Sequence, residues 1–310
     1  MLLPLLMVGL LWNILQQAVL AQGCNGDSAF WEVSTRHLGE QPPQCFVQQM
    51  MVSKFDCSWQ IASLDQLVAD CEANPQRRIV IYSHGNWMEY GEARQRALMI
   101  FRMMCACHNQ PLTFIAFTWP SERDQGFAKD IRGKKDLIDI ESYYLASLIT
   151  LLPADQPIGI MGFSFGTRVV SGALHLLGGG TLGGRGIMQS DAERPPYRVS
   201  LYAGAFDRDA FTSGGEYRCG LTNVEQLVNL FNSDDPVLRR FHFFERGSSP
   251  TAAGYRGLLI PCSVPNSSGI AGLFPSITQY DCRAIGRSHS ETDYLRCPAM
   301  QRAMQNVLGY

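Results

Sequence analysis

Apolar strands alternate with amphipathic helices through the central part of this 310-residue chain. The strand segments are apolar at consecutive positions, so both of their faces must be buried, whereas each helix segment carries one apolar stripe. The segments expected as strands are 77–85, 112–120 and 157–164, and those expected as helices are 91–107, 130–152 and 167–177. Strands of this kind occur in parallel sheets that helices cover on both sides. The alternation therefore predicts an α/β fold, with a mostly parallel sheet and helices on both faces.

The same alternation continues to the end of the chain. Further strands are expected at 197–206, 224–235 and 277–283, and a closing helix at 297–308. Hydrophobic residues make up 46% of the chain and charged residues 17%, which is typical of a globular protein with a large core. The sequence contains no internal repeat and no second hydrophobic core. We therefore predict one domain over residues 77–310.

The beginning of the chain has the character of an export signal, because its first 24 residues contain no charged side chain. An apolar core is followed by the small-residue pattern Val19-Leu20-Ala21, which favours a signal peptide over residues 1–21. Two alternatives stay open: retention of this segment as a membrane anchor, and lipidation at Cys24. We expect cleavage, no stable membrane insertion afterwards, and a secreted, periplasmic or cell-surface location.

All ten cysteines follow this leader. An even number of cysteines in an exported chain indicates disulfide bonds, although their connectivity cannot be deduced from spacing. Four of the ten lie in residues 22–76, a stretch without regular alternation in which one short helix is expected at 63–73. We interpret 22–76 as a cysteine-rich N-terminal extension that wraps over the domain and is pinned by disulfides. Near the C-terminus, Cys282 and Cys297 flank a polar loop, and we expect at least one of them to be bridged.

Several classes of partner and cofactor are disfavoured. The formal net charge is −2 and no cluster of Lys and Arg exceeds a pair, so a nucleic-acid surface is not expected. The run Cys105-Ala-Cys107-His108 has no second Cys/His pair at zinc-site spacing. The glycines of 178–186 lack the Gly-Lys-Ser/Thr ending of a phosphate-binding loop. The sequence therefore implies neither a metal nor an organic cofactor, and it does not indicate an oligomeric state.

The pattern Gly162-Phe-Ser164-Phe-Gly166 lies between an apolar strand and a helix. Taken alone, the pattern is also compatible with an ordinary glycine-rich turn. Its position is typical of a nucleophile elbow, in which a serine sits on a strained turn from strand to helix. A side chain in place of either glycine would collide with neighbouring backbone in such a turn. The context therefore favours Ser164 as a nucleophile.

A serine nucleophile needs a base, and the base needs an orienting carboxylate. In this architecture the order along the chain is serine, acid, histidine. Only His242 and His289 follow a suitable acid, and His242 lies too close to that acid to return to the serine from a separate loop. We therefore assign His289 as the base. The acid should follow the strand at 224–235, which favours Asp235 and leaves Asp234 as the alternative.

The reaction also requires donors for a developing oxyanion. The backbone N–H of Phe165, directly after the nucleophile, is the first expected donor. The second is expected in the turn after the strand at 77–85, where Gly85 lets the chain bend and Asn86 offers its N–H. We interpret His84 as a structural residue that holds this turn by hydrogen bonds.

The dipeptide HG at 84–85, the tripeptide WPS at 119–121 and the elbow around Ser164 together resemble a known family. It is a bacterial α/β-hydrolase family of largely unassigned function, marked by HG-x-N, WPS and H-S-x-G motifs. The resemblance covers about residues 78–240 and includes Asp130 after the WPS strand. It implies the α/β-hydrolase fold for this part of the chain.

The resemblance also implies site residues, because Asp235 and His289 fall where the family's acid and histidine lie. Three features depart from the family pattern. Gly162 stands where the family usually has a histidine, Asn86 comes one place early, and the cysteine-rich N-terminal part has no counterpart. These departures concern the substrate and the oxyanion donors more than the three catalytic residues.

These observations predict an exported serine hydrolase, carboxylesterase- or lipase-like, that cleaves an ester, thioester or similar acyl bond through an acyl-enzyme. The expected substrate is a small-molecule or lipid-like acyl compound. Trp87, Phe163 and Phe165 near the expected site favour an apolar acyl group, although core packing explains such residues equally well. Two alternatives stay open: a catalytically silent binding protein of the same fold, and a peptidase of the same fold.

Overall fold

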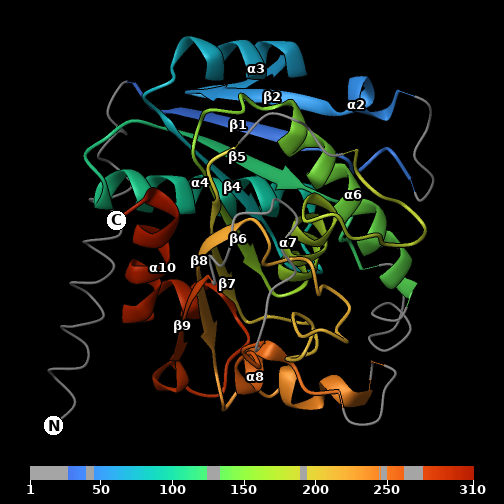
Figure 1. Ribbon diagram of the computed structural model, residues 1–310. Coiled ribbons are helices and arrows are strands. Elements are labelled where there is room, and N and C mark those ends of the chain that lie inside the picture. Colours follow the sequence, from blue (N-terminus) through green and yellow to red (C-terminus); the bar gives the residue numbers. More distant parts are fainter. Residues whose placement is uncertain are drawn as a thin grey trace, which may run out of the picture.

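The computed structural model describes residues 27–39, 45–123, 133–188, 194–243, 245, 250–261 and 275–310. Within these residues, nine strands form one sheet in the order β3-β2-β1-β5-β4-β6-β7-β8-β9, and helices lie on both of its sides (Figure 1). The strands are β1 (Ala29–Ser34), β2 (Met51–Asp56), β3 (Ser58–Ala62), β4 (Arg78–Ser83), β5 (Leu112–Thr118), β6 (Ile158–Phe163), β7 (Tyr197–Tyr202), β8 (Val224–Phe231) and β9 (Ser276–Asp281).

Most of the sheet is parallel. Strands β1, β5, β4, β6, β7, β8 and β9 run in one direction, and the hairpin of β2 and β3 adds an antiparallel edge. Every residue of β5 and of β6 is buried, as expected for strands covered on both faces. The predicted α/β class with a mostly parallel sheet is confirmed.

Helices cover both faces of this sheet. Helices α4 and α10 contact each other on one face, and α6 packs against α7 on the other (Figure 1). No helix in the described ranges is long and apolar enough to span a bilayer. The helices are α2 (Phe46–Gln49), α3 (Leu64–Ala73), α4 (Tyr90–Cys107), α6 (Lys135–Leu151), α7 (Phe165–Leu177), α8 (Ala253–Arg256), α9 (Glu291–Leu295) and α10 (Pro298–Leu308), with short 3-10 helices η1 (Leu238–Phe243) and η2 (Arg283–Ile285).

The N-terminal segment differs from the irregular extension that we expected over residues 22–76. Its described part contributes β1, β2 and β3 to the sheet, and β1 is buried along its whole length beside β5. The apolar run around Trp31 therefore completes the core instead of wrapping over it. The helix expected at 63–73 is present as α3, and Ser63 forms a capping box with Gln66 at its start.

The three described cysteines of this segment form no disulfide in the structure. Cys45 and Cys57 are exposed free thiols, and Cys71 is a buried one. Sheet pairing and side-chain packing, rather than disulfide bonds, hold the described part of the segment on the domain. The expected leader over 1–21 and Cys24 lie outside the described residues.

A buried carboxylate also fixes β1 against its neighbours. Glu32 is almost completely buried, and its Oε2 accepts hydrogen bonds from Arg94 Nε at 2.8 Å and from Tyr90 Oη at 3.1 Å, both on α4. Its Oε1 accepts from Thr118 Oγ1, at the end of β5, at 3.1 Å. Removing one partner of a buried ion pair typically costs about 3–5 kcal/mol. Glu32 thus ties the first described strand to the central part of the domain.

A second buried acid, Glu141 on α6, lies beside the end of β1. Thr35 Oγ1 donates a hydrogen bond to Glu141 Oε2 at 2.5 Å. Burial raises the pKa of the Glu141 carboxyl from 4.5 to about 8, although the Thr35 hydrogen bond and the charge of Arg36 act in the opposite direction. The desolvation of the charged carboxylate outweighs both favourable contacts.

The stability of the fold should therefore decrease as the pH rises from acidic to mildly alkaline values. Because the pKa of Glu141 is higher in the folded state, the folded protein holds a proton that the unfolded chain releases between pH 4.5 and about 8, so stability falls as the pH rises through this range. At pH 9, where the buried carboxyl is charged, we expect the free energy of unfolding of Glu141→Gln to be about 1–2 kcal/mol higher than that of the wild type. At pH 4, where the carboxyl is neutral, the two free energies should be similar. Urea denaturation at both pH values measures this.

The matched control is Glu72→Gln, which changes an exposed acid on α3. It should keep the pH dependence of the wild type. If Glu141→Gln is no more stable than wild type at pH 9, the carboxyl of Glu141 does not carry the burial penalty described here.

Candidate active site

Ser164 occupies the turn between β6 and α7 with φ 50° and ψ −117°. A positive φ is costly for a non-glycine residue and persists only where the surroundings enforce it. The flanking glycines allow this turn. A Cβ on Gly166 would lie 2.2 Å from the carbonyl oxygen of Ser83, and a Cβ on Gly162 would lie 2.8 Å from the carbonyl oxygen of Gly166. The strand–turn–helix context expected around Ser164 is therefore present.

Three side chains from distant parts of the sequence form one hydrogen-bonded chain. Ser164 Oγ lies 2.9 Å from His289 Nε2, and His289 Nδ1 lies 2.7 Å from Asp235 Oδ2. The other carboxylate oxygen, Oδ1, accepts from the backbone N–H groups of Val237 and Leu238. An ionised carboxylate only accepts, so the proton of a neutral His289 ring resides on Nδ1. The lone pair of Nε2 then faces the serine hydroxyl.

The structure also distinguishes between the two candidate acids. Asp235 is fully buried and faces His289, whereas Asp234 is exposed and its backbone N–H donates to Asn232 Oδ1. His242, the histidine that sequence order left as a second possibility, is exposed on η1. The structure thus brings together Ser164, Asp235 and His289.

The loop that carries His289 is anchored by a residue that the sequence analysis did not single out. Asn232 is buried directly after β8, and its Nδ2 donates to the carbonyl oxygens of Gly286 at 2.9 Å and Ser288 at 3.1 Å. These bonds fix the backbone on the N-terminal side of His289. The sequence does show a polar residue, Asn232, at the end of an apolar strand just before the acid. Its role could not be predicted from this, because its partners lie more than 50 residues away.

The two expected oxyanion donors lie at the same site. Asn86 and Phe165 line one cavity together with Ser164 and His289. The backbone N–H of Trp87 is bound to the carbonyl oxygen of Ser121 at 2.7 Å. The Trp87 amide is therefore engaged within the protein, and the Asn86 N–H stays the predicted donor beside that of Phe165.

His84 has the contacts of a structural residue at the base of this turn. It is fully buried, and burial, followed by the charge of Arg36, lowers its pKa from 6.5 to about 3. The ring is therefore neutral near pH 7. Its Nδ1 lies 2.8 Å from the carbonyl oxygen of Gly85, and its Nε2 accepts from the backbone N–H of Trp119 at 3.3 Å.

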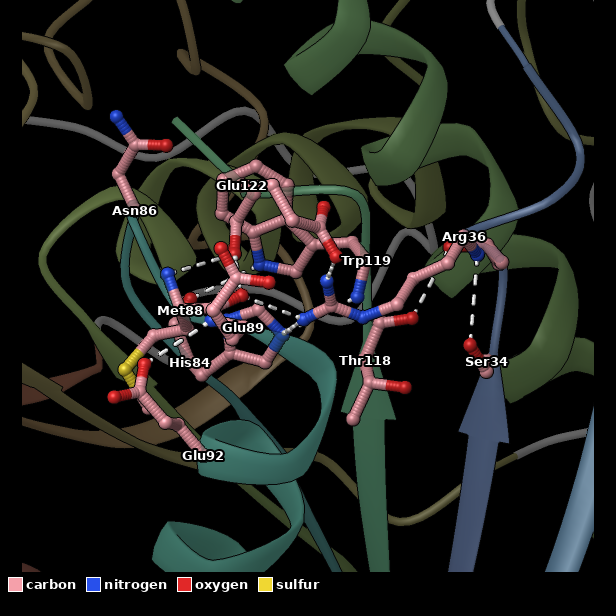
Figure 2. Close-up of polar contacts among 12 residues, drawn as sticks. Ser34, Arg36, His84, Asn86, Met88, Glu89, Glu92, Thr118, Trp119 and Glu122 are labelled. Carbon is pink, nitrogen blue, oxygen red and sulfur yellow. Dashed lines mark hydrogen bonds and ion pairs between the residues drawn. The ribbon is translucent and has the colours of Figure 1, made fainter. Parts of the chain in front are cut away.

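Trp119, the first of the WPS residues, meets the same turn from the end of β5 (Figure 2). The Trp119 ring stacks on His84 with an interplanar angle of 5°, and its Nε1 donates to the His84 carbonyl oxygen at 3.0 Å. Ser121 Oγ donates to the Met88 carbonyl oxygen at 3.0 Å. The HG and WPS motifs are thus parts of one support, which explains why both accompany a serine elbow. Asp130, the further residue of the resemblance, lies outside the described residues.

A cavity of about 260 Å³ opens beside the serine and the histidine. Its walls are mainly apolar and aromatic, with polar groups confined to Ser164, His289 and Asn86. Such a cavity suits an apolar group attached to a polar reacting centre. The lining residues are Asn86, Trp87, Phe163, Ser164, Phe165, Ala205, Val237, Leu238, Phe241 and His289.

A buried acid that the sequence analysis missed lies behind His289. Glu291 Oε1 accepts hydrogen bonds from Tyr82 Oη at 2.7 Å and from Tyr202 Oη at 2.6 Å. Burial raises the pKa of Glu291 above its ordinary value, against the opposing charge of Arg96. These bonds tie the helix that follows His289 to β4 and β7. Nothing in the sequence distinguishes this acid from the neighbouring polar residues of its loop.

In the part of the chain that the structure describes, no group of three or more His, Cys, Asp or Glu side chains is arranged to hold a metal. Cys105 and Cys107 lie in the last turn of α4.

Comparison with protein families places this site in context. Residues 60–235, more than half of the chain, match the family described as "Alpha/beta hydrolase of unknown function (DUF900)". The chain belongs to this α/β-hydrolase family. The match covers the β4 turn, the WPS residues, the elbow and Asp235, whereas β1 and the His289 loop lie outside it. A search of curated proteins gives no match.

Solved structures resemble the chain only distantly. Esterase B from Lactobacillus rhamnosis is 10% identical over 99% of this chain and 95% of its own, with a TM-score of 0.35. The same enzyme in a form titled as C6-C4 SN3 inhibited is 11% identical over 98% of this chain and 96% of its own, with a TM-score of 0.37.

The elbow glycine gives a direct test of this geometry. We expect Gly166→Ala to lower the free energy of unfolding by about 1–3 kcal/mol, because its Cβ would overlap the carbonyl oxygens of Ser83 and His84. Thermal or urea denaturation measures the loss. The control is Gly91→Ala on α4, where a Cβ meets nothing within 4 Å, and this variant should be at least as stable as wild type. Equal stability of the two variants would contradict the close approach at Gly166.

Proposed function

We propose that this α/β-hydrolase is an exported serine hydrolase that cleaves an ester, thioester or similar acyl bond through an acyl-enzyme. The observation that carries the proposal is the unbroken chain from Asp235 through His289 to Ser164, at 2.7 and 2.9 Å. Ser164 and His289 line an apolar cavity, from which a substrate can reach the hydroxyl. Belonging to a hydrolase family supports the same reaction class.

In the proposed reaction, His289 Nε2 takes the proton of Ser164 as Oγ attacks the substrate carbonyl carbon. The carbonyl oxygen becomes an oxyanion, which the N–H groups of Phe165 and Asn86 bind. Imidazolium then donates its proton to the leaving alkoxide or thiolate, and the acyl group remains on Ser164. Water, deprotonated by the same nitrogen, attacks the acyl-enzyme and releases the acid. Asp235 holds the ring in the required tautomer throughout.

The proposed substrate carries an apolar acyl group. Phe163, Phe241 and Leu238 give the cavity apolar walls, so burial of methylene groups would contribute about 0.8 kcal/mol each to binding. The cavity of about 260 Å³ has room for a short or medium chain and not for a large polymer segment. A lipid-like or small acyl ester fits these walls better than a polar peptide does.

The proposal predicts that hydrolysis of a p-nitrophenyl ester depends on Ser164. Ser164→Ala should lower kcat by about 10⁴-fold or more, because the nucleophile is removed, and Asp235→Asn should lower it by about 10⁴-fold, because the wrong tautomer of His289 is favoured. Circular dichroism checks that both variants fold. The control is Ser290→Ala, an exposed serine beside His289, which should keep wild-type kcat. Wild-type turnover in Ser164→Ala would refute the proposed mechanism.

We further propose that the exported protein forms a disulfide between Cys282 and Cys297, which flank His289. Their Sγ atoms lie 2.7 Å apart in the structure, about 0.7 Å beyond the bonded distance of about 2.05 Å. Both side chains are buried. Oxidation removes two protons and two electrons, which an oxidised dithiol protein of the export compartment accepts by thiol–disulfide exchange. The bond would close a short loop around the proposed base.

Peptide mapping tests this pairing. In protein purified without reductant, denatured and alkylated, we expect the peptides of Cys282 and Cys297 to be linked, whereas the exposed Cys45 and Cys57 are alkylated. Recovery of Cys282 and Cys297 as alkylated thiols would rule the disulfide out.

A further inference from the structure

The guanidinium of Arg36 contacts both ends of the turn that carries Asn86. Its Nη2 lies 3.2 Å from His84 Nε2 and donates to the Met88 carbonyl oxygen at 3.1 Å. Its Nη1 pairs with Glu122. Figure 2 shows this side chain extending from beyond the end of β1 to the turn. One side chain thus bridges residues 84 and 88, on either side of the expected oxyanion donor.

The hydrogen bonds of His84 fix its tautomer. Nδ1 lies 2.8 Å from a carbonyl oxygen, that of Gly85, so Nδ1 carries the proton. Nε2 faces two donors, the backbone N–H of Trp119 and the Arg36 guanidinium, so it is the acceptor. The ring therefore joins the turn to Arg36 through one nitrogen and to its own backbone through the other. Both roles require a neutral ring, which is the form that burial enforces.

The turn needs such support because its backbone conformation is unfavourable. Trp87 has a φ of +58°, a value that a bulky side chain rarely adopts. Gly85 approaches the Phe163 ring so closely that a Cβ there would lie 2.8 Å from it. A strained turn keeps one geometry only where its neighbours over-determine it. Arg36 supplies two of the contacts that do so.

A second cation acts on the middle of the same turn. Lys134 is buried, and its Nζ donates to Asn86 Oδ1 at 2.9 Å and to the Ser121 carbonyl oxygen at 3.1 Å. Lys134 therefore links Asn86 to the residues that follow β5, whereas Arg36 links both ends of the turn to the segment directly after β1. Arg36 lies outside residues 60–235, which match the family, so its attachment to the turn comes from the part of the chain before the matched residues.

We propose that Arg36 is a positioning residue of the oxyanion hole: it holds the turn from His84 to Met88 so that the Asn86 N–H points at the developing oxyanion. The inference rests on the proposed function. Arg36 does not touch the substrate, and its charge is paired with Glu122, so its effect is geometric. The segment directly after β1, which carries Arg36, then contributes to catalysis, whereas β1 itself contributes to the core.

A positioning role of Arg36 and a purely stabilising role predict different effects on kcat and KM. A misplaced donor weakens binding of the transition state more than binding of the substrate, because the full oxyanion exists only in the transition state. Arg36→Met should therefore lower kcat by about 10- to 100-fold while KM changes by less than about threefold. Affinity for a trifluoromethyl ketone, whose adduct with Ser164 bears an oxyanion, should fall by a factor similar to that of kcat. Arg36→Lys should recover part of both losses.

The matched control is Arg94→Met. It removes another largely buried cation that is bound to β1, through Glu32 rather than through the turn. This variant should lose stability but keep kcat within about twofold of wild type. Hydrogen exchange gives a readout that does not require turnover: in Arg36→Met the amides of 84–88 should exchange faster, and in Arg94→Met they should not.

The outcomes are distinct. Wild-type kcat and unchanged exchange over 84–88 in Arg36→Met would overturn the positioning role, as would an equal loss of kcat in Arg94→Met. Absence of turnover in the wild type, or full turnover in Ser164→Ala, would instead refute the proposed function, whatever Arg36 does. Faster exchange confined to Arg36→Met, together with the loss of kcat at nearly constant KM, supports the inference.

Discussion

The hydrogen bond between Asp235 and His289 is the interaction on which the candidate site depends. It decides which nitrogen of the ring carries the proton and therefore which nitrogen faces Ser164. The carboxylate itself is held by the N–H groups of Val237 and Leu238, so it cannot turn away from the ring. The orientations of the Asp235 carboxylate and of the His289 ring are thus both fixed by hydrogen bonds. This is the preorganisation that a proposed general base requires.

The three hydrogen-bonded side chains come from two parts of the fold, the sheet and the loop that carries His289. The sheet provides the elbow and the end of β8, where Ser164 and Asp235 lie, and backbone bonds set both positions. The histidine comes from a loop, and Asn232 and Glu291 replace the missing sheet pairing with buried hydrogen bonds on either side of it. The turn from His84 to Met88, which carries the proposed oxyanion donor Asn86, is supported in the same manner by buried contacts of His84 and Arg36. Buried polar contacts therefore hold the parts of the site that secondary structure does not.

Local patterns were sufficient to predict the parallel sheet and the elbow, and the order of residues along the chain then pointed to His289 and to an acid at 234 or 235. Apolar runs indicate strands that are buried on both faces, and the glycines around Ser164 indicate a close approach of backbone segments. Each of these signals is contained in a few neighbouring residues. The sequence analysis did not recognise β1 as part of the sheet, because its parallel partner β5 lies more than 80 residues further along the chain, and the side-chain hydrogen bonds of Trp31 and Glu32 also come from distant segments. The same holds for Arg36 and Asn232, whose roles arise only when distant backbone groups come together. The choice between Asp234 and Asp235 likewise required the direction of each side chain.

The most direct test of the central claim is to treat the wild-type protein with a fluorophosphonate and to locate the adduct by peptide mass spectrometry. A serine whose hydroxyl faces the free nitrogen of an oriented histidine should lose its proton to that nitrogen and displace fluoride. The account predicts one phosphonyl group per chain, attached to Ser164. An unmodified protein, or an adduct on any other residue, would contradict it.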